Sequence, residues 1–164
     1  MALPNKVLPG FSASMYAQSG ATPTPLTLAQ LSTLANVSAI AVSGNLLNIE
    51  AIPAFGQDDA VANFSVAGTR QSDKIPTQSA PTSMTITAAW NPSDAGLLLM
   101  RADAYSGTID RTFVISATDG TNIVYYSFNG RVGQFQIDAQ PGAEAKCIFT
   151  IHPRGNLYGW CNNV

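Results

Sequence analysis

The chain has 164 residues, which is most simply a single domain able to bury roughly 70% of the surface of its unfolded chain. Charged residues make up 11% of the sequence, against about 25% in an average domain, so we expect a surface that is polar but mostly uncharged. A formal net charge of -2 and the lack of a basic run argue against tight nucleic-acid binding, and no apolar run is long enough to span a membrane. Copies of a protein with such a surface repel one another only weakly, which is compatible with a subunit of an assembly. Extracellular β proteins can have a similar composition.

The first 25 residues are expected to form an extended N-terminal arm, because they contain four prolines and show no sustained helical or strand period. An arm of this length reaches on the order of 80 Å. Its apolar side chains are too many for a solvated tail and need a surface to cover: Leu3, Val7, Leu8, Phe11, Met15 and Tyr16. The sequence leaves open whether this surface belongs to the same chain or to a neighbouring subunit.

Residues 26–164 are expected to form one mainly β domain. Leucines at three-residue spacing in residues 27–36 predict one short helix or a 3₁₀ turn. Residues 37–42 and 45–55 predict the two strands of a hairpin. The second of these strands would have one face in the core and one polar face towards a water-filled space. The polar face would carry Asn48 and Glu50.

Residues 57–81 predict a short strand around Phe64, followed by a long loop at 68–81. Loops of this length without structure of their own are uncommon in compact domains and are usually functional. A contact between subunits and a plain surface connection are both compatible with the sequence. The charged residues of this segment are Arg70, Asp73 and Lys74.

The strand predicted over residues 84–90 runs directly into a helix. Asn91 can cap that helix and Asp94 would lie in its first turn, where a negative charge suits the helix dipole. We expect the helix over residues 92–105, with its end at Gly107. Either a second subunit or the chain's own core must cover this helix, because it is apolar nearly all round. Its two charged residues are Arg101 and Asp103.

Three more strands are expected, over residues 108–118, 121–138 and 144–152, with a bend in the second of them near 130–133. The predicted fold is therefore mainly β: two packed antiparallel sheets, as a sandwich or barrel, with one flanking helix. The C-terminal tail, 153–164, is assigned to no element. Polar residues alternate with apolar ones near the end of the second strand: Gln134, Gln136 and Asp138.

The sequence contains little that predicts catalysis. His152 is the only histidine, and the motifs GxSxG, GxGxxG and GxxxxGK[ST] are absent. Cys147 lies on a predicted strand and is expected to be a small core residue, and with Cys161 it does not form a disulfide scaffold, so reduced thiols are expected. Asp58 and Asp59 are adjacent on a strand and would point apart. We therefore expect no enzyme activity, no cofactor and no metal.

The order of elements resembles that of the major tail tube proteins of long-tailed bacteriophages over about residues 26–152. The most specific part is the segment TITAAWNPSDAGLLLMRADAYSGTIDRTFVI, residues 85–115, in which a strand runs into an Asn-Pro-x-Asp helix start. Type VI secretion tube proteins share that fold. The resemblance implies hexameric rings that stack into a tube, around a channel that conducts genome DNA and is lined by one sheet from each subunit.

What the resemblance implies for partners is equally concrete. They would be further copies of the chain, tail tip or initiator and terminator proteins, and the tape measure protein, while double-stranded DNA would pass without sequence-specific binding and no membrane would be involved. The protein would belong to the tail of the virion and assemble in the host cytoplasm.

Alternation along the predicted strands assigns the channel lining to Asn48, Glu50, Thr85, Thr87, Gln134, Gln136 and Asp138. The residues expected at contacts between subunits are Leu3, Val7, Leu8, Phe11, Tyr16, Arg70, Asp73, Lys74, Leu98, Arg101 and Asp103. A different class of protein also fits the low charge and many turns: a β-sandwich that binds carbohydrate or a cell surface, on a virion or secreted. Its exposed aromatic residues would be Tyr105, Tyr158 and Trp160.

Overall fold

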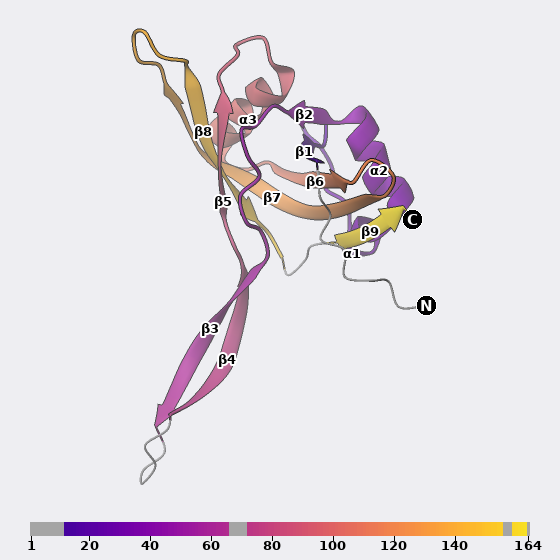
Figure 1. Ribbon diagram of the computed structural model, residues 1–164, viewed down its shortest axis with the longest axis vertical. Helices are drawn as coiled ribbons and strands as arrows, with labels where there is room; N and C mark the ends of the chain where they lie inside the picture. The colour runs from indigo at the N-terminus through magenta and orange to yellow at the C-terminus, as the bar shows by residue number, and fades with distance from the viewer. Residues whose placement is uncertain (1–11, 66–71, 156–158, 164) are drawn as a thin grey trace.

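The computed structural model describes residues 12–65, 72–155 and 159–163, with the backbone alone at 59, 61–65, 72–79 and 159–163 (Figure 1). Most strands belong to one antiparallel sheet in the order β2-β1-β6-β7-β8-β5, with β9 added along β7. The strands are β1 (Ser12–Ala17), β2 (Asn45–Leu47), β5 (Met84–Ala89), β6 (Asp110–Thr118), β7 (Ile123–Asp138), β8 (Lys146–Pro153) and β9 (Gly159–Asn163). The predicted mainly β fold is confirmed.

The sheet curls on itself so that its two halves face one another. β7 makes this possible because it has 16 residues and pairs first with β6 and then with β8. A register shift between Val132 and Phe135 bends it close to the predicted place. A single bridge between Ile49 and Ala88 brings the chain after β2 beside β5, at the other edge of the sheet. The result is a nearly closed β layer around one core.

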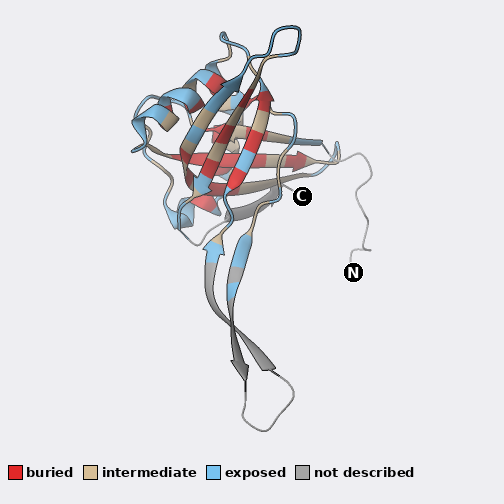
Figure 2. Cartoon of the chain, turned by 90° about the vertical axis from the view of Figure 1, so that its left-hand side faces the viewer, coloured by how far each residue is buried: buried red, intermediate tan, exposed pale blue. Residues whose placement is uncertain are grey.

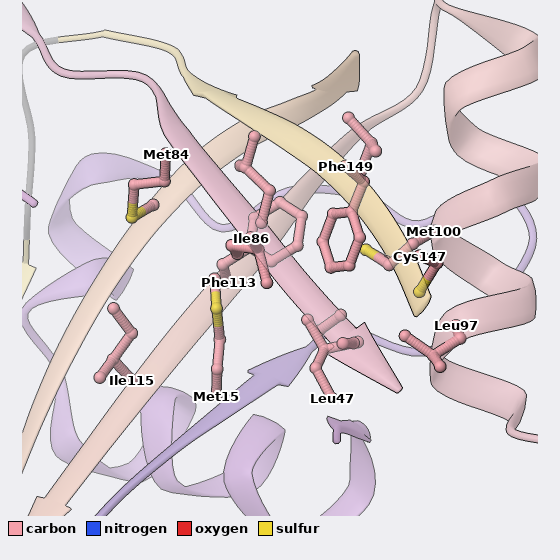
Figure 3. Close-up of a cluster of buried hydrophobic side chains, with 14 of the residues drawn as sticks. Met15, Leu47, Met84, Ile86, Leu97, Met100, Phe113, Ile115, Cys147 and Phe149 are labelled. Carbon is pink, nitrogen blue, oxygen red and sulfur yellow. The ribbon is translucent and has the colours of Figure 1, made fainter. Parts of the chain in front are cut away.

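That core fills the inside of the curled sheet. β5 and β8 contribute Ile86 and Phe149, which lie opposite Phe113 and Ile115 of β6 (Figure 3). The helix α3 (Ala95–Ser106) closes the cluster with two fully buried side chains. These are Leu97 and Met100. Buried and more exposed residues alternate along β5 and β8, which is why the sequence pattern located these strands correctly.

Two further helices lie on the outer side of the sheet. These are α1 (Leu28–Leu31), which begins with a capping box formed by Thr27 and Gln30, and α2 (Leu34–Ser43). The helix α2 covers β6, and α1 lies beside β9. Val37 of α2 packs on Val114 of β6, in a second small cluster. The strand and hairpin predicted over 37–55 are therefore wrong, because residues 34–43 are helical and β2 pairs with β1 instead. No helix within the described ranges is long and apolar enough to cross a membrane.

The long loop predicted at 68–81 is also wrong for its described part. β3 (Gln57–Ser65) and β4 (Ser72–Pro81) pair from their first to their last residues as a two-stranded sheet. This β3–β4 hairpin projects away from the body of the protein, as Figures 1 and 2 show. Its strands lie outside the main sheet and its core pattern, and Pro76, which has no N–H to donate, lies beside the register shift at Ala60 and Val61.

A described segment near each end of the chain takes part in the main sheet, which the sequence did not predict. Ser12–Ala17 was expected within an extended arm, but it is β1, and its Met15 and Ala17 are buried in the core. Within the C-terminal tail, β9 pairs with β7 over Ile123 to Ser127. Four residues of the expected arm lie outside the described residues: Leu3, Val7, Leu8 and Phe11.

The start of α3 is shifted by three residues from its prediction. Asp94, and not Asn91, is the N-cap: its Oδ1 accepts hydrogen bonds from the backbone N–H of Gly96 at 2.8 Å and of Leu97 at 3.1 Å. Asn91 instead accepts a bond from Ser93 N–H at 2.9 Å, in a turn that precedes the helix. The predicted end is confirmed, since Gly107 follows the helix with φ 62°.

Candidate functional site

The outer face of β5, β8 and the second part of β7 is mostly polar, with Ile148 as an apolar side chain within it, and we call it the polar face. Met84, Ile86 and Ala88 are buried on the inner side of β5, so Thr85 and Thr87 point outwards. The register aligns the outward side chains into rows, because Thr85 lies opposite Thr150, and both Thr87 and Gln136 lie opposite Ile148. Asp138 follows in the same alternation. Four predicted lining residues thus share this polar face: Thr85, Thr87, Gln136 and Asp138.

One end of the polar face carries a group of charges around Lys146. Lys146 lies opposite Asp138 in the sheet, and its Nζ is 2.7 Å from Oε1 of Glu50. The hydrogen bond to Glu50 raises the pKa of Lys146, with a smaller contribution from Glu144. Backbone N–H of Glu50 donates to the carbonyl of Thr87, which holds the Glu50 segment against the edge of β5. The cation on this face is therefore surrounded by carboxylates.

The two remaining lining candidates lie outside the aligned rows, although Gln134 points to the same outer side as Gln136. Gln134 is exposed at the bulge of β7, on the opposite side from Phe135, whose ring packs inside on Phe149 at a centroid distance of 6.0 Å. Asn48 instead donates from Nδ2 to Oδ2 of Asp94, so it belongs to the start of α3 rather than to the polar rows.

Sequence reasoning missed His152 on the same face of β8. His152 is exposed, and its Nδ1 lies 2.8 Å from Oγ of Ser83. The imidazole lies across the bulge at Gly133, where an added Cβ would be 2.6 Å from Nε2. The alternation that places Lys146 outside also places His152 outside, so this residue could have been found from the pattern.

A second ionic group lies where β6 begins. Asp110 accepts from Arg131 Nε at 2.9 Å and from Arg154 Nη1 at 2.7 Å. Burial pushes the pKa of Asp110 upwards, but the bonds from the two arginines outweigh it and hold that pKa below its usual value. Arg131 also donates to the carbonyls of Gly107 and Thr108, at the end of α3. Two cations are thus tied to one carboxylate.

The outer side of α3 carries an exposed stripe of three residues. Leu98 is 40% exposed and Tyr105 is 74% exposed, while Arg101 between them lies with its guanidinium carbon 5.6 Å from the centre of the Tyr105 ring. Their spacing of three and four residues places them on one helix face. We call Leu98, Arg101 and Tyr105 the α3 stripe. Two of the residues predicted at subunit contacts, Leu98 and Arg101, lie in it.

Asp103 does not lie on this surface, so its prediction as a residue at a subunit contact is wrong. The residue is 1% exposed, and its carboxylate binds Arg111, which is completely buried. Tyr16 is half-buried and packs beneath α2. Arg70 lies outside the described residues, and only the backbone of Asp73 and Lys74 is described, in β4.

The described cations are nearly all neutralised within the chain. Of the Lys and Arg side chains that the structure describes, four have carboxylate partners: Arg111, Arg131, Lys146 and Arg154. Arg101 of the α3 stripe lies on an aromatic ring instead. Over the residues whose side chains are described, no three of the His, Cys, Asp and Glu side chains form a group that could hold a metal ion.

Comparison with solved structures identifies the fold. A sheath/tube terminator of the PVC extracellular contractile injection system matches 99% of this chain and 100% of its own, with a TM-score of 0.61 and 10% identity. A component of the anti-feeding prophage baseplate matches 99% of this chain and 97% of its own, with a TM-score of 0.56 and 10% identity. The SPP1 tail tube protein matches 92% of this chain and 76% of its own, with a TM-score of 0.53 and 12% identity.

These matches show that the chain has the tail-tube fold, as the sequence resemblance implied. No protein-family model and no curated protein matches the sequence.

Proposed function

We propose that the chain is a structural subunit of a tail or injection tube, which assembles with further copies of itself into stacked rings around a channel. One combined observation carries this proposal. The chain has a tail-tube fold, and the polar outer face of its sheet has no described Lys or Arg side chain without a carboxylate partner. A sheet with one core face and one polar face suits the wall of a water-filled tube. The role is structural rather than enzymatic.

The channel wall of this proposal is the polar face of β5, β8 and the second part of β7. Phosphate groups bind proteins mainly by releasing counterions to Lys and Arg. The polar face offers hydroxyl and amide groups, with Lys146 tied to Glu50 and opposite Asp138. Double-stranded DNA can therefore pass along this face without being held.

Ring assembly requires contacts between two different patches of neighbouring copies. The α3 stripe supplies one of these patches, because it exposes a leucine and a tyrosine that its own chain does not cover. The β3–β4 hairpin supplies another contact, since a two-stranded ribbon away from a core is marginally stable unless something packs on it. Hexameric rings, a virion tail location and contacts with tail tip, terminator and tape measure proteins follow from the resemblance to tail tube proteins.

Negative-stain electron microscopy of the purified protein, alone and at raised concentration, tests the proposal. Rings or hollow tubes are expected, either spontaneously or after seeding with a tail-tip extract. Leu98→Asp should abolish them because it places a charge in the α3 stripe, whereas Val42→Asp, at an exposed position of α2, should not. Particles that stay small even with the extract would contradict the proposal and favour a carbohydrate-binding module.

A further inference from the structure

The curled sheet has an apolar pocket at one end, apart from the polar face and the α3 stripe. Its volume is about 320 Å³. It lies where β1 begins and β6 ends, and the chain that leads into the β3–β4 hairpin forms its other wall. The lining is made by Ala13, Ile52, Phe55, Ile115, Ala117 and Tyr126.

Small residues create the hollow. Ala13 and Ala117 are direct partners in the β1–β6 register, so two methyl groups stand where the neighbouring layers of the core hold Met15 and Ile115. Across the pocket, the ring of Phe55 meets Tyr126 edge to face at 5.3 Å. The core thus continues into an apolar space that its own strands do not fill, and close packing of this space needs further apolar side chains.

The chain itself supplies such side chains immediately beside the pocket. Ala13 is the second residue of β1, so residues 1–11 are joined directly to the pocket wall. This segment contains five large apolar residues, Met1, Leu3, Val7, Leu8 and Phe11, and one charged side chain, Lys6. The sequence Leu8-Pro9-Gly10-Phe11 matches a type II turn, which favours proline second and glycine third. A turn at this place would reverse the chain and return it towards the pocket.

We propose that residues 1–11 of the same chain fill this pocket, with Leu8 and Phe11 packed against Ala13, Ile52 and Phe55. The tether favours the chain's own segment over a neighbour's, since a few linking residues give an effective concentration in the millimolar range. This assigns Leu8 and Phe11 to the chain's own fold rather than to a subunit contact. It holds for a single chain, whatever that chain assembles into.

The pocket also connects the N-terminal segment to the β3–β4 hairpin. Ile52 and Phe55 belong to the irregular chain that runs from β2 to the first residue of β3, Gln57. A filled pocket therefore fixes the root of the hairpin and the direction in which it projects. Without residues 1–11, the backbone amides at this root should exchange with solvent several-fold faster, while those of the β6–β7 pair should be unchanged.

Disulfide trapping in the full chain tests the proposal. In a Cys161→Ser background, Leu8→Cys is combined either with Ile52→Cys, on the pocket wall, or with Thr118→Cys. Thr118 is the matched control because it pairs with Ser12 in the sheet but does not line the pocket. Mild oxidation should form a bond within one chain several-fold faster to position 52 than to position 118. Ala13→Leu, which fills the hollow from the wall, should remove this preference.

The outcomes separate the two possible sources of the segment. A bond within the monomer, read as a shifted monomer band on a non-reducing gel, supports the proposal. Cross-linked dimers and ladders as the main product would show that a neighbour's segment fills the pocket and would overturn it, as would equal rates at both positions. If a cysteine variant fails to fold, the test is hydrogen exchange at the root of the hairpin in the chain that lacks residues 1–11. Unchanged exchange at this root would also overturn the proposal.

Discussion

Arg111 and Asp103 form a two-point ion pair in the interior of the protein. Arg111 Nε lies 2.7 Å from Asp103 Oδ2 and Nη2 lies 2.9 Å from Oδ1, and neither side chain reaches solvent. The remaining guanidinium nitrogen donates to the carbonyls of Gln18 and Gly20, in the chain after β1. The pair therefore ties α3 to β6 and to the end of β1, and each charge is fully satisfied only while the other is present.

Removing one partner of this pair should cost far more than removing a partner of an exposed pair. Asp103→Ala leaves a buried guanidinium without its counter-charge, and we expect a loss of about 3–5 kcal/mol in the free energy of unfolding. Asp110→Ala is the control, because its side chain is 30% exposed, and should cost about 1 kcal/mol or less. Urea unfolding followed by circular dichroism measures both. Equal losses would contradict the structural role of the buried pair.

The N-cap of α3 provides a second comparison. Asp94→Ala removes the acceptor for two backbone N–H groups and should lower the free energy of unfolding by about 1–2 kcal/mol. Asn91→Ala removes only one bond in an exposed turn and should cost about 0.5 kcal/mol or less. Thermal or urea unfolding of the two variants gives the answer. A larger loss of stability for Asn91→Ala than for Asp94→Ala would show that Asn91 is the N-cap, as the sequence suggested.

Asp110 should contribute to the acid sensitivity of the fold. Its pKa is lower in the folded protein than in the unfolded chain, so the unfolded state binds more protons as the pH falls. The contribution is present above the usual aspartate pKa of about 3.9 and is lost as the pH falls through the lowered folded value. Asp110→Asn should therefore flatten the decline of the unfolding free energy below about pH 4. A slope identical to that of the unsubstituted protein would contradict this.

Cys147 should be chemically inert while the protein is folded. It is completely buried in the core, and burial raises the pKa of its thiol, so the reactive thiolate is disfavoured. In a Cys161→Ser background at pH 8, a thiol reagent should modify Cys147 only as fast as the protein unfolds, and denaturant should make the reaction immediate. Rapid modification of the native protein would show that β8 opens locally.

The strands and the helix at the centre of the fold were predictable because their signals are local. Alternation located β5, β6 and β8, and Gly107 marked the end of α3. Residues 37–42, which lie in α2, were misread as a strand, since a short apolar run fits both periods, and only packing of Val37 against Val114 decides for a helix. The β3–β4 hairpin was missed because it projects away from the body of the protein, so its pairing is not tied to the core pattern of the main sheet.

The site was predictable only as far as strand alternation extends. Thr85 and Thr87 were placed on the polar face by alternation, whereas the pairing of Lys146 with Glu50 depends on the segment after β2, which no period describes. The burial of Asp103 was missed because it depends on a contact between two elements and not on a pattern within one. Its partner Arg111 lies on a neighbouring strand, and the sequence does not state which side of α3 faces that strand.

The proposed channel wall leads to a final prediction, which concerns transport rather than stability. Glu50→Lys removes the ion-pair partner of Lys146 and adds a second cation beside it. Asp138→Lys puts a cation in place of the carboxylate that lies opposite Lys146 in the sheet register. Free cations on the wall bind phosphates by counterion release, so each variant should slow DNA release from particles while tube assembly stays normal. The control is Val42→Lys, which adds a cation on α2, away from the polar face. Raised salt should restore the rate of release, because the attraction is electrostatic. Normal release by both variants, in tubes that assemble fully, would show that another face of the sheet lines the channel.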